Sequence, residues 1–477
     1  MKRLLCLLLT GLLLFSAAAC TVQLPPSAAT DPTENPVEPP FEPETPSEPI
    51  TEPVEEPTEP PIELQPIELQ PIENPPIQPG ESIDHPPIDL TDPIPPIYSP
   101  MGGAVAVGGY DDFSNLLSAA LLSGTQNRNL SPISVYLALA MVAEGANGDT
   151  QAELLQLLGC KTIEDLRGIC GSMLESLSID AEHSTLDLHN SLWMADKING
   201  APVTFHEEYL KTLSDIYRSE ANTVEFGTKS ASKQIADWIN ENTRGKINVS
   251  PDALNFDPST LAVLINTIYL KDGWADTFDP DRTEPGKFDA PDGEIDVDYM
   301  NRTDKNSVVR MGDGWMAYRV YLNRVGWVTF VLPDEGVALS ELLGSPDAID
   351  RLLRSGTEQK YDVSLKIPKF KFQDRMELTA ILSALGLNLS FSPAADFSGM
   401  SDTPCRIDSV LQESFIGVDE NGVEAAAYTM VAMRATGFMP VELEKIDFHL
   451  TRPFFYAIES RDGTVLFIGT VTVPGEE

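Results

Sequence analysis

The feature that most constrains folding is a proline- and glutamate-rich stretch near the N-terminus. Residues 21–100 of the 477 hold 24 of the 39 prolines and seventeen Asp and Glu, with no Lys or Arg. Proline lacks a backbone N–H and fixes its φ angle, so such a segment cannot hold a helix or a central strand. Repulsion between glutamates favours extended polyproline II. We therefore expect a disordered tether over residues 20–104 and one folded domain over residues 105–477.

The first twenty residues are typical of an export signal. Lys2 and Arg3 precede an apolar stretch over residues 4–15, shorter than the about 20 residues that span a bilayer. Small residues then lead directly to Cys20, an arrangement that resembles a bacterial lipoprotein signal, in which this cysteine is lipidated. The alternative is an ordinary cleaved signal peptide with an incidental cysteine. We favour lipidation, because a long tether suits an anchored domain. This predicts a signal peptide over residues 1–19 and a secreted, cell-surface lipoprotein.

The charge balance limits the classes of partner, and the cysteine count limits the possible disulfide bonds. Residues 101–477 carry 56 acidic and 30 basic residues, a balance that disfavours nucleic acid and anionic membranes as partners. We therefore expect a monomer that contacts the membrane only through its lipid anchor. Cys160, Cys170 and Cys405 are an odd number, which excludes a complete set of disulfides. One bridge stays open, but we favour three small buried residues.

The sequence contains no motif for catalysis. There are five histidines, and the chain lacks a G-x-S-x-G elbow, an H-E-x-x-H pair and a phosphate-binding glycine loop. His206 is followed by two glutamates but not by a second histidine at metal-binding spacing, so we interpret it as the start of a helix. No cysteine pair has zinc spacing. We expect neither an enzyme, nor a metal, nor a cofactor.

Hydrophobic periodicity predicts an α+β fold. Apolar residues recur at helical spacing over residues 134–143, 149–158 and 231–240. Short β-branched or aromatic runs over residues 328–332, 363–367 and 465–471 indicate strands. Helices thus concentrate early and strands late, which is typical of α+β architecture rather than of alternating βαβ units.

A weakly charged segment near the C-terminus is the most informative. From Ala425 to Val441 its only charge is Arg434. Written as a strand, alternate residues from Val423 are small or apolar with one hydroxyl, whereas the other set carries both Glu424 and Arg434. That alternation suits a strand with one buried and one wet face. Three consecutive alanines equally permit a helix.

The residues around this segment resemble the serpin family. Asp-Glu-Asn-Gly-Val-Glu-Ala-Ala-Ala over residues 419–427 is similar to the serpin hinge, where the reactive-centre loop begins. Further family-like stretches occur in the right order over about residues 110–474. They are Asn129–Ser134, Asn266–Trp274 with Phe278, Leu332–Gly336, Ile367–Phe370, Leu385–Leu387, Ala395–Gly399, Arg452–Phe454 and Phe467–Gly469.

The resemblance implies a fold and a mechanism. The fold has a large, mainly antiparallel central sheet, further sheets and an exposed reactive-centre loop. A serine protease attacks the loop as a suicide substrate, and the loop then inserts into the central sheet and traps the acyl-enzyme. The alternative is a non-inhibitory serpin fold that serves as a binding or adhesive surface lipoprotein.

The resemblance also assigns residues. Lys369 should meet Glu420 at the breach, where the sheet opens, and a charge at Val423 should block trapping. The hinge residues are Glu420, Gly422, Val423, Glu424, Ala425, Ala426, Ala427 and Thr429. The shutter residues beneath the sheet are Ser131, Ser134, Asn266 and Gln412, of which Gln412 stands where the family often has histidine.

The attacked bond follows from a count of seventeen residues from Glu420, which gives Thr436-Gly437. That bond favours elastase-like or subtilisin-like proteases. Arg434-Ala435, for trypsin-like enzymes, and Met433-Arg434, for chymotrypsin-like or elastase-like ones, remain alternatives.

Overall fold

The computed structural model describes residues 109–254, 256–423 and 443–475. The chain divides into two units at residues 85 and 86, and all described residues belong to the second. The tether and signal predicted at the N-terminus lie outside the described residues, and so does the predicted domain start at residue 105.

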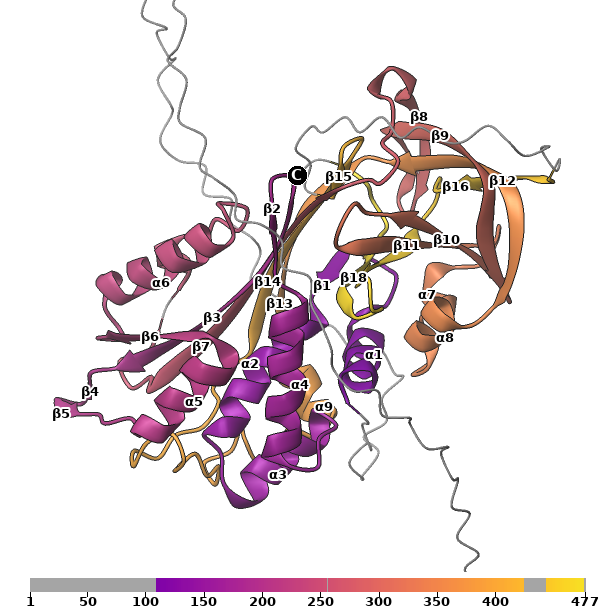
Figure 1. Cartoon of the computed structure of the whole chain (residues 1–477). Helices are drawn as coiled ribbons and strands as arrows, with labels where there is room; N and C mark the ends of the chain where they lie inside the picture. Colours follow the sequence, from indigo (N-terminus) through magenta and orange to yellow (C-terminus); the bar gives the residue numbers. More distant parts are fainter. Residues whose placement is uncertain (1–108, 255, 424–442, 476–477) are drawn as a thin grey trace, which may run out of the picture. The chain divides into compact units, whose positions relative to one another are not determined.

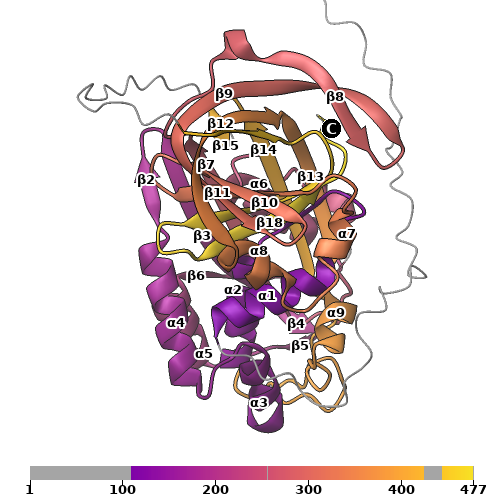
Figure 2. The same ribbon diagram turned by 90° about the vertical axis from the view of Figure 1, so that its right-hand side faces the viewer.

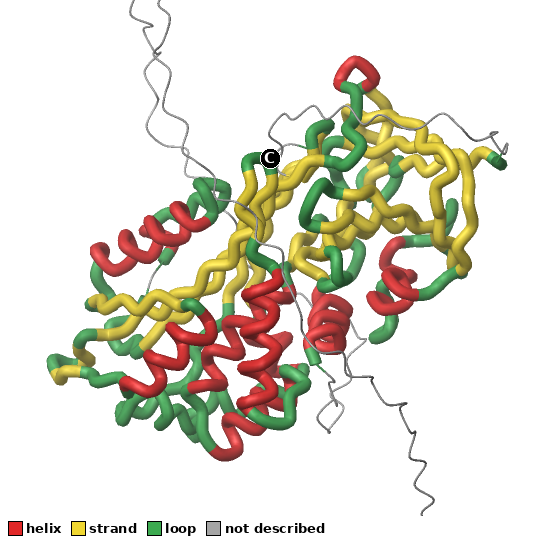
Figure 3. The backbone as a smooth tube through the Cα atoms, viewed as in Figure 1, coloured by secondary structure: helices red, strands yellow, loops and turns green. Residues whose placement is uncertain are grey.

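Helices dominate the first half of the domain and strands the second, as the periodicity predicts (Figures 1 and 3). The predicted helices correspond to α2, α3 and α6, and the one expected to start after His206 is α5, whose N-cap is His206. The helices are α1 (Tyr110–Leu121), α2 (Pro132–Glu144), α3 (Gly148–Leu157), α4 (Ile163–Ser176), α5 (Glu207–Tyr217), α6 (Lys229–Asn242), α7 (Leu339–Leu342), α8 (Ala348–Arg354) and α9 (Thr379–Ala384).

Nine strands of the described chain form one continuous sheet. Its order is β1 (Arg128–Leu130), β18 (Val465–Val471), β17 (Phe454–Ser460), β11 (Gly326–Pro333), β10 (Trp315–Tyr321), β9 (Gly293–Gly312), β12 (Thr357–Pro368) and β16 (Lys445–His449), with β8 (Glu284–Ala290) paired to β9. Figure 2 shows β8 and β9 as a long ribbon at one end of the domain. The predicted strands of residues 328–332, 363–367 and 465–471 are β11, β12 and β18.

Seven described strands form a second sheet, here called the central sheet. Its order is β13 (Phe370–Glu377), β14 (Leu411–Asp419), β15 (Gly422–Val423), β7 (Ala262–Gly273), β3 (Ser184–Ala195) and β2 (Ile179–Ala181), with β6 (Ser219–Val224) parallel to β3. The neighbours on both sides of β15 are long, whereas β15 has two residues. A two-stranded hairpin, β4 (Lys197–Ile198) with β5 (Ala201–Pro202), completes the strands.

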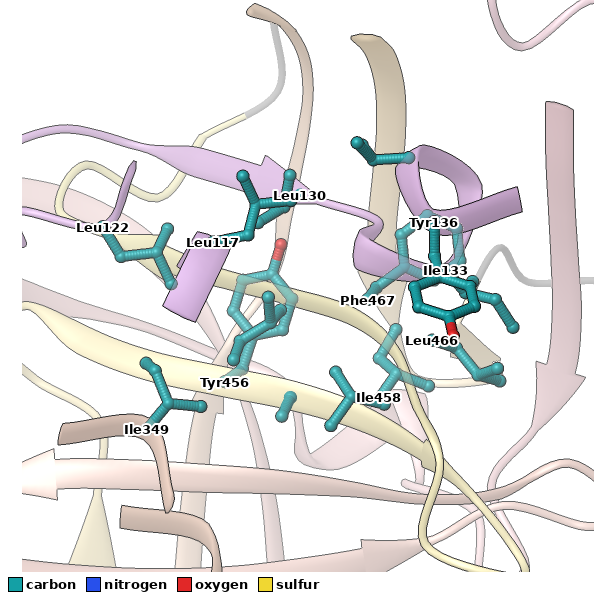
Figure 4. Packing of buried hydrophobic residues seen from close by; sticks show 14 of the residues in the cluster. Leu117, Leu122, Leu130, Ile133, Tyr136, Ile349, Tyr456, Ile458, Leu466 and Phe467 are labelled. Carbon is teal, nitrogen blue, oxygen red and sulfur yellow. The ribbon is translucent and has the colours of Figure 1, made fainter. Parts of the chain in front are cut away.

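The main core lies between the two sheets and α1, α2 and α8. Figure 4 shows Leu117, Tyr136 and Ile349 from these three helices beside Tyr456 and Leu466 of β17 and β18. Phe454 joins the layers, with its ring 5.8 Å from that of Phe370 on β13 and 6.0 Å from that of Phe330 on β11. This face of the central sheet, toward the main core, is its inner face.

The opposite, outer face of the central sheet is covered in part by α6 (Figure 1). Ile235 and Trp238 of α6 pack against Val263 and Ile265 of β7. Leu264 and Ile268, at the alternate positions of β7, pack against the main core. Period-two alternation therefore fixes which residues of each central strand face outward.

Candidate functional site: an interrupted sheet

The two-residue strand β15 starts a strand that the described chain does not continue. Gly422 and Val423 pair on one side with Asp419 and Val418 of β14. On the other side they pair with Gly273 and Asp272 of β7. The chain thus enters between two central strands at Gly422 and Val423, the two described residues of the predicted hinge that lie in a strand.

Gly422 is required by the closeness of β7. Its φ angle is +155°, and a Cβ atom on it would lie 2.1 Å from the Asp272 carbonyl oxygen and 2.7 Å from the Gly273 Cα. Only glycine combines this backbone angle with so close an approach. The Gly-Val step of the hinge therefore fixes the entry point.

Val423 points inward, as the alternation predicts. It is 3 % exposed and belongs to the main core. Together with Ile268 and Leu270 of β7 and Ile416 of β14 it lines a cavity of about 20 Å³.

The carbonyls just before β15 are held by the Gly-x-Trp…Phe part of the motif near β7. The Trp274 backbone N–H donates to Asn421 O at 3.0 Å, and its indole Nε1 donates to Asp419 O at 2.8 Å. The Phe278 N–H donates to Glu420 O at 3.3 Å. These residues therefore position the start of the hinge, a role that the motif alone did not reveal.

Among the described residues, no strand follows Val423 between β7 and β14. In the described residues β7 and β14 have no ladder pairing with each other, and a cavity of about 880 Å³ lies along them. We call the gap between residues 262–270 of β7 and residues 411–417 of β14 the slot. Its floor is the face of α2 that bears Val135 and Leu139, and Ile239 of α6 lines its outer side.

The predicted breach contact between Lys369 and Glu420 is present. Lys369 Nζ lies 3.2 Å from Glu420 Oε2, and Thr283 Oγ1 donates to Glu420 Oε1 at 2.7 Å. Burial acts to raise the pKa of Glu420, but the hydrogen bonds from Thr283 and Lys369 outweigh it and leave that pKa lowered. The ionised carboxylate is thus the form that this site favours. Thr283 was missed by sequence reasoning, because nothing in its local sequence marks it.

Three of the predicted shutter residues are bonded together beneath the slot. Gln412 Oε1 accepts from Ser131 N at 3.0 Å, and Gln412 Nε2 donates to Ser131 O at 2.7 Å. Ser131 Oγ lies 3.1 Å from Ser134 Oγ and donates to Leu466 O at 2.9 Å. The glutamine therefore ties β14 to the start of α2.

Asn266, the fourth, lies on the opposite side of the slot. Its Nδ2 donates to Asn190 Oδ1 on β3 at 2.8 Å, whereas its own Oδ1 is buried and has no hydrogen-bond partner among the described residues. The slot, which all four shutter residues line, separates it from Gln412. Asn190 is a further residue that the sequence did not indicate.

Several predicted sites fall outside the described residues. These are Cys20 and the loop residues Glu424, Ala425, Ala426, Ala427, Thr429, Met433, Arg434, Ala435, Thr436 and Gly437. Within the described part Cys160, Cys170 and Cys405 are unpaired, the first two buried. The described residues contain no cluster of three metal-ligating side chains, and none of their helices has the length and apolarity of a membrane span.

Comparisons with known proteins agree with this geometry. Residues 109–474 match the family model "Serpin (serine protease inhibitor)". The chain belongs to the serpin family. Members of this family are generally inhibitors that target proteases and are not enzymes.

Individual relatives cover most of this serpin. An uncharacterized serpin-like protein of Thermococcus kodakarensis is 31% identical over 77% of this chain and 85% of its own. Serpin-Z1B of Triticum aestivum is 29% identical over 76% and 93%. Tengpin, a thermophilic serpin solved in the native state, superposes with a TM-score of 0.66 at 27% identity, over 76% of this chain and 93% of its own.

Proposed function

We propose that this serpin is an extracellular serine protease inhibitor that acts once, as a suicide substrate. The protease serine attacks the carbonyl carbon of the scissile residue and forms an ester. The peptide bond to the next residue breaks, and its nitrogen leaves as an amine with the serine's proton. The freed end of the loop then extends β15 through the slot, and the protease is displaced before water hydrolyses the ester.

The observation that carries the proposal is the open slot beyond β15. A strand already lies between β14 and β7 for two residues, and no pairing closes the rest of that edge in the described chain. Unpaired backbone groups and exposed apolar side chains are a store of free energy that an added strand would release.

Continuing the register of β15 supports the same proposal. If the pairs Val423↔Asp272 and Val423↔Val418 are continued in register, position 429 would come between Asn266 and Gln412 after insertion. Thr429 lies on the inward parity with Val423, so its hydroxyl would stand between these two amides. It would supply the donor that Asn266 Oδ1 lacks.

For the attacked bond we propose Thr436-Gly437, and an elastase-like or subtilisin-like protease as the target. Arg434-Ala435 and Met433-Arg434 remain the alternatives, for trypsin-like and for chymotrypsin-like or elastase-like enzymes. The proposal rests on the count of seventeen residues from Glu420, and the contact of Glu420 with Lys369 supports counting from that residue.

We further propose that the chain is a bacterial surface lipoprotein, anchored through Cys20 and held away from the membrane by residues 20–104. The support is the signal-like N-terminus and the proline- and glutamate-rich composition. Labelling with a radioactive fatty acid in bacteria tests it: the chain should carry label and a Cys20→Ala variant should not. Label on both, or on neither, contradicts the anchor.

The inhibitory function is tested with the mature chain carrying Cys20→Ser. It is mixed separately with pancreatic elastase, subtilisin, trypsin and chymotrypsin and run on denaturing gels. A band at the summed mass that survives denaturant is expected, and mass spectrometry of the released peptide identifies the bond. If every protease clips the loop and stays active, and the clipped chain is no more heat-stable than the intact one, a non-inhibitory binding role replaces the proposal.

A further inference from the structure

The two residues of β7 that pair with β15 lie beyond the ladder that joins β7 to β3. In the described chain that ladder ends at the pair Thr185↔Lys271, whereas β15 pairs with Asp272 and Gly273. A strand end with fewer paired neighbours opens more easily than a strand paired on both sides. The position of this end of β7 therefore depends on contacts other than the β3 ladder.

The turn between β10 and β11 lies against this end of β7. The Asn323 N–H donates to Gly273 O at 2.9 Å, and the Ala275 N–H donates to Tyr321 O at 2.8 Å. These bonds run between backbone groups and join a turn of the continuous sheet to the central sheet. The turn is thus fixed to β7 beside the point where the hinge enters.

The carboxylate of Asp272 strengthens this junction. Asp272 is 1 % exposed, and its Oδ1 accepts from Ser184 Oγ of β3 at 2.6 Å. Its Oδ2 accepts from the backbone N–H groups of Arg324 and Val325 in the turn, at 2.8 and 2.7 Å. A buried carboxylate is costly without such donors, and hydrogen bonds to an ionised group are the stronger ones. One side chain therefore binds β7 both to β3 and to the turn.

The same residue adjoins the hinge. Asp272 pairs directly with Val423, so the two side chains lie on the same, inward face of the sheet, with Cβ atoms about 4.5–5.5 Å apart. Gly422 comes so close to the Asp272 carbonyl oxygen that a Cβ atom would lie 2.1 Å from it. An entry point with so little room tolerates little displacement of the Asp272 backbone.

We infer that Asp272 is a positioning residue for loop insertion, whose carboxylate holds the end of β7 at the spacing that admits the hinge. With this end fixed, the strand that grows from β15 meets a partner already in register. Without the carboxylate the end of β7 moves more freely, and insertion begins more slowly. Asp272 touches neither the protease nor the scissile bond. The inference rests on the proposed function and adds a residue to its machinery.

The test measures how many molecules of the mature chain carrying Cys20→Ser are consumed for each protease inhibited. Hydrolysis of the ester competes with insertion, so slower insertion raises this number. Asp272→Ala leaves Ser184 and two backbone N–H groups without their acceptor, and the number consumed in excess of one should rise about two- to tenfold, the rate change for one net hydrogen bond. Asp272→Asn should recover most of this, because an amide oxygen still accepts from the turn and an amide N–H can donate to Ser184 Oγ.

Asp374→Asn is the matched control. Asp374 is a second buried carboxylate, on β13, where it pairs with Arg128 at 2.9 Å and accepts from the Asn129 N–H at 2.9 Å. This variant should lower the melting temperature of the intact chain and leave the number consumed unchanged. The inference is overturned if Asp272→Ala lowers the melting temperature without raising the number, or if Asp374→Asn raises it equally.

Ser184→Ala keeps the inference testable if Asp272→Ala does not fold. It removes one donor and retains both bonds to the turn, so the excess consumed should rise about twofold. An unchanged number would overturn the role of Asp272 while the wild type still forms its stable complex. A wild type that forms no such complex and gains no heat stability on cleavage overturns the inhibitory function itself.

Discussion

The two edges of β7 differ sharply in how far they are paired in the described chain. On one edge β7 pairs with β3 over ten residues, from Thr185↔Lys271 to Met194↔Ala262. On the other edge, the described residues pair with β7 at Gly273 and Asp272 only, and the slot begins there. In the described chain, the same strand is therefore paired along one edge and largely unpaired along the other.

The comparison shows at which edge of β7 an added strand would release free energy. On the paired edge, the backbone of β7 is bonded to β3 along residues 262–271. Beside the other edge, residues 262–266 are half-buried and Asn266 Oδ1 has no partner in the part of the chain that the structure describes. Each hydrogen bond gained is worth about 0.5–1.5 kcal/mol net, so that a strand bonded on two sides would release on the order of 10 kcal/mol. Changes at the two edges should therefore act on different states of the protein.

The largest effect is expected from a charge at Val423. Val423→Glu would place a carboxylate at a site that is 3 % exposed among apolar neighbours. The strand could then not start, and cleavage of the loop should no longer raise the melting temperature. Calorimetry of intact and cleaved chains checks this, with Val423→Thr as the control that should keep the rise. A Val423→Glu chain that still gains heat stability would show that insertion does not begin at β15.

A smaller but general loss is expected on the closed side of the molecule. Phe454 is fully buried between the sheets, and Phe454→Ala should lower the free energy of unfolding by about 3–5 kcal/mol in intact and cleaved forms alike. Leu264→Ala, at the slot, should cost less than about 2 kcal/mol in the intact form, because this side chain is still partly exposed. Its cost should grow after cleavage. Urea titrations of both forms measure the two differences, and equal costs for Leu264→Ala in the two forms would contradict the comparison.

The sequence predicts some features of the candidate site but not others. The inward direction of Val423 follows from period-two alternation, and the meeting of Lys369 with Glu420 follows from the family resemblance. The bonds of Gln412 to Ser131, the pairing of Asn266 with Asn190 and the hydroxyl of Thr283 at Glu420 do not. Each of these joins residues at least 76 positions apart, at places where polar side chains have several partners in reach. Local pattern gives the direction of a side chain, whereas the choice among distant partners depends on the assembled sheets.

At the breach the expected cost is moderate. Lys369→Ala would leave the mostly buried carboxylate of Glu420 with Thr283 as its remaining side-chain partner, at a cost of about 1–3 kcal/mol in the intact form. The pKa of Glu420 is lowered in the folded chain, so its contribution is present above the ordinary carboxyl range and is lost as the pH falls through the lowered value. Urea unfolding at pH 7 and pH 3 should show the Lys369→Ala penalty at the first pH and little of it at the second. Lys369→Arg is the control, and an equal penalty at both values would mean that the ion pair is not its source.

The smallest effect is expected at β16, the last strand in the order of the continuous sheet. His449 Nε2 lies 3.0 Å from Ser364 Oγ across the parallel pairing of β16 with β12. Burial lowers the pKa of His449, Asp447 acts to raise it and Lys366 to lower it further. Because the folded chain disfavours the protonated ring, stability is full above the ordinary histidine pKa and decreases as the pH falls below it. Melting temperatures between pH 8 and pH 5 should decline less steeply for His449→Gln than for the wild type, while the heat stability gained on cleavage stays unchanged. A His449→Gln chain that altered this gain would mean that β16 and the slot are coupled, and that the difference between the two edges of β7 depends on the far end of the other sheet.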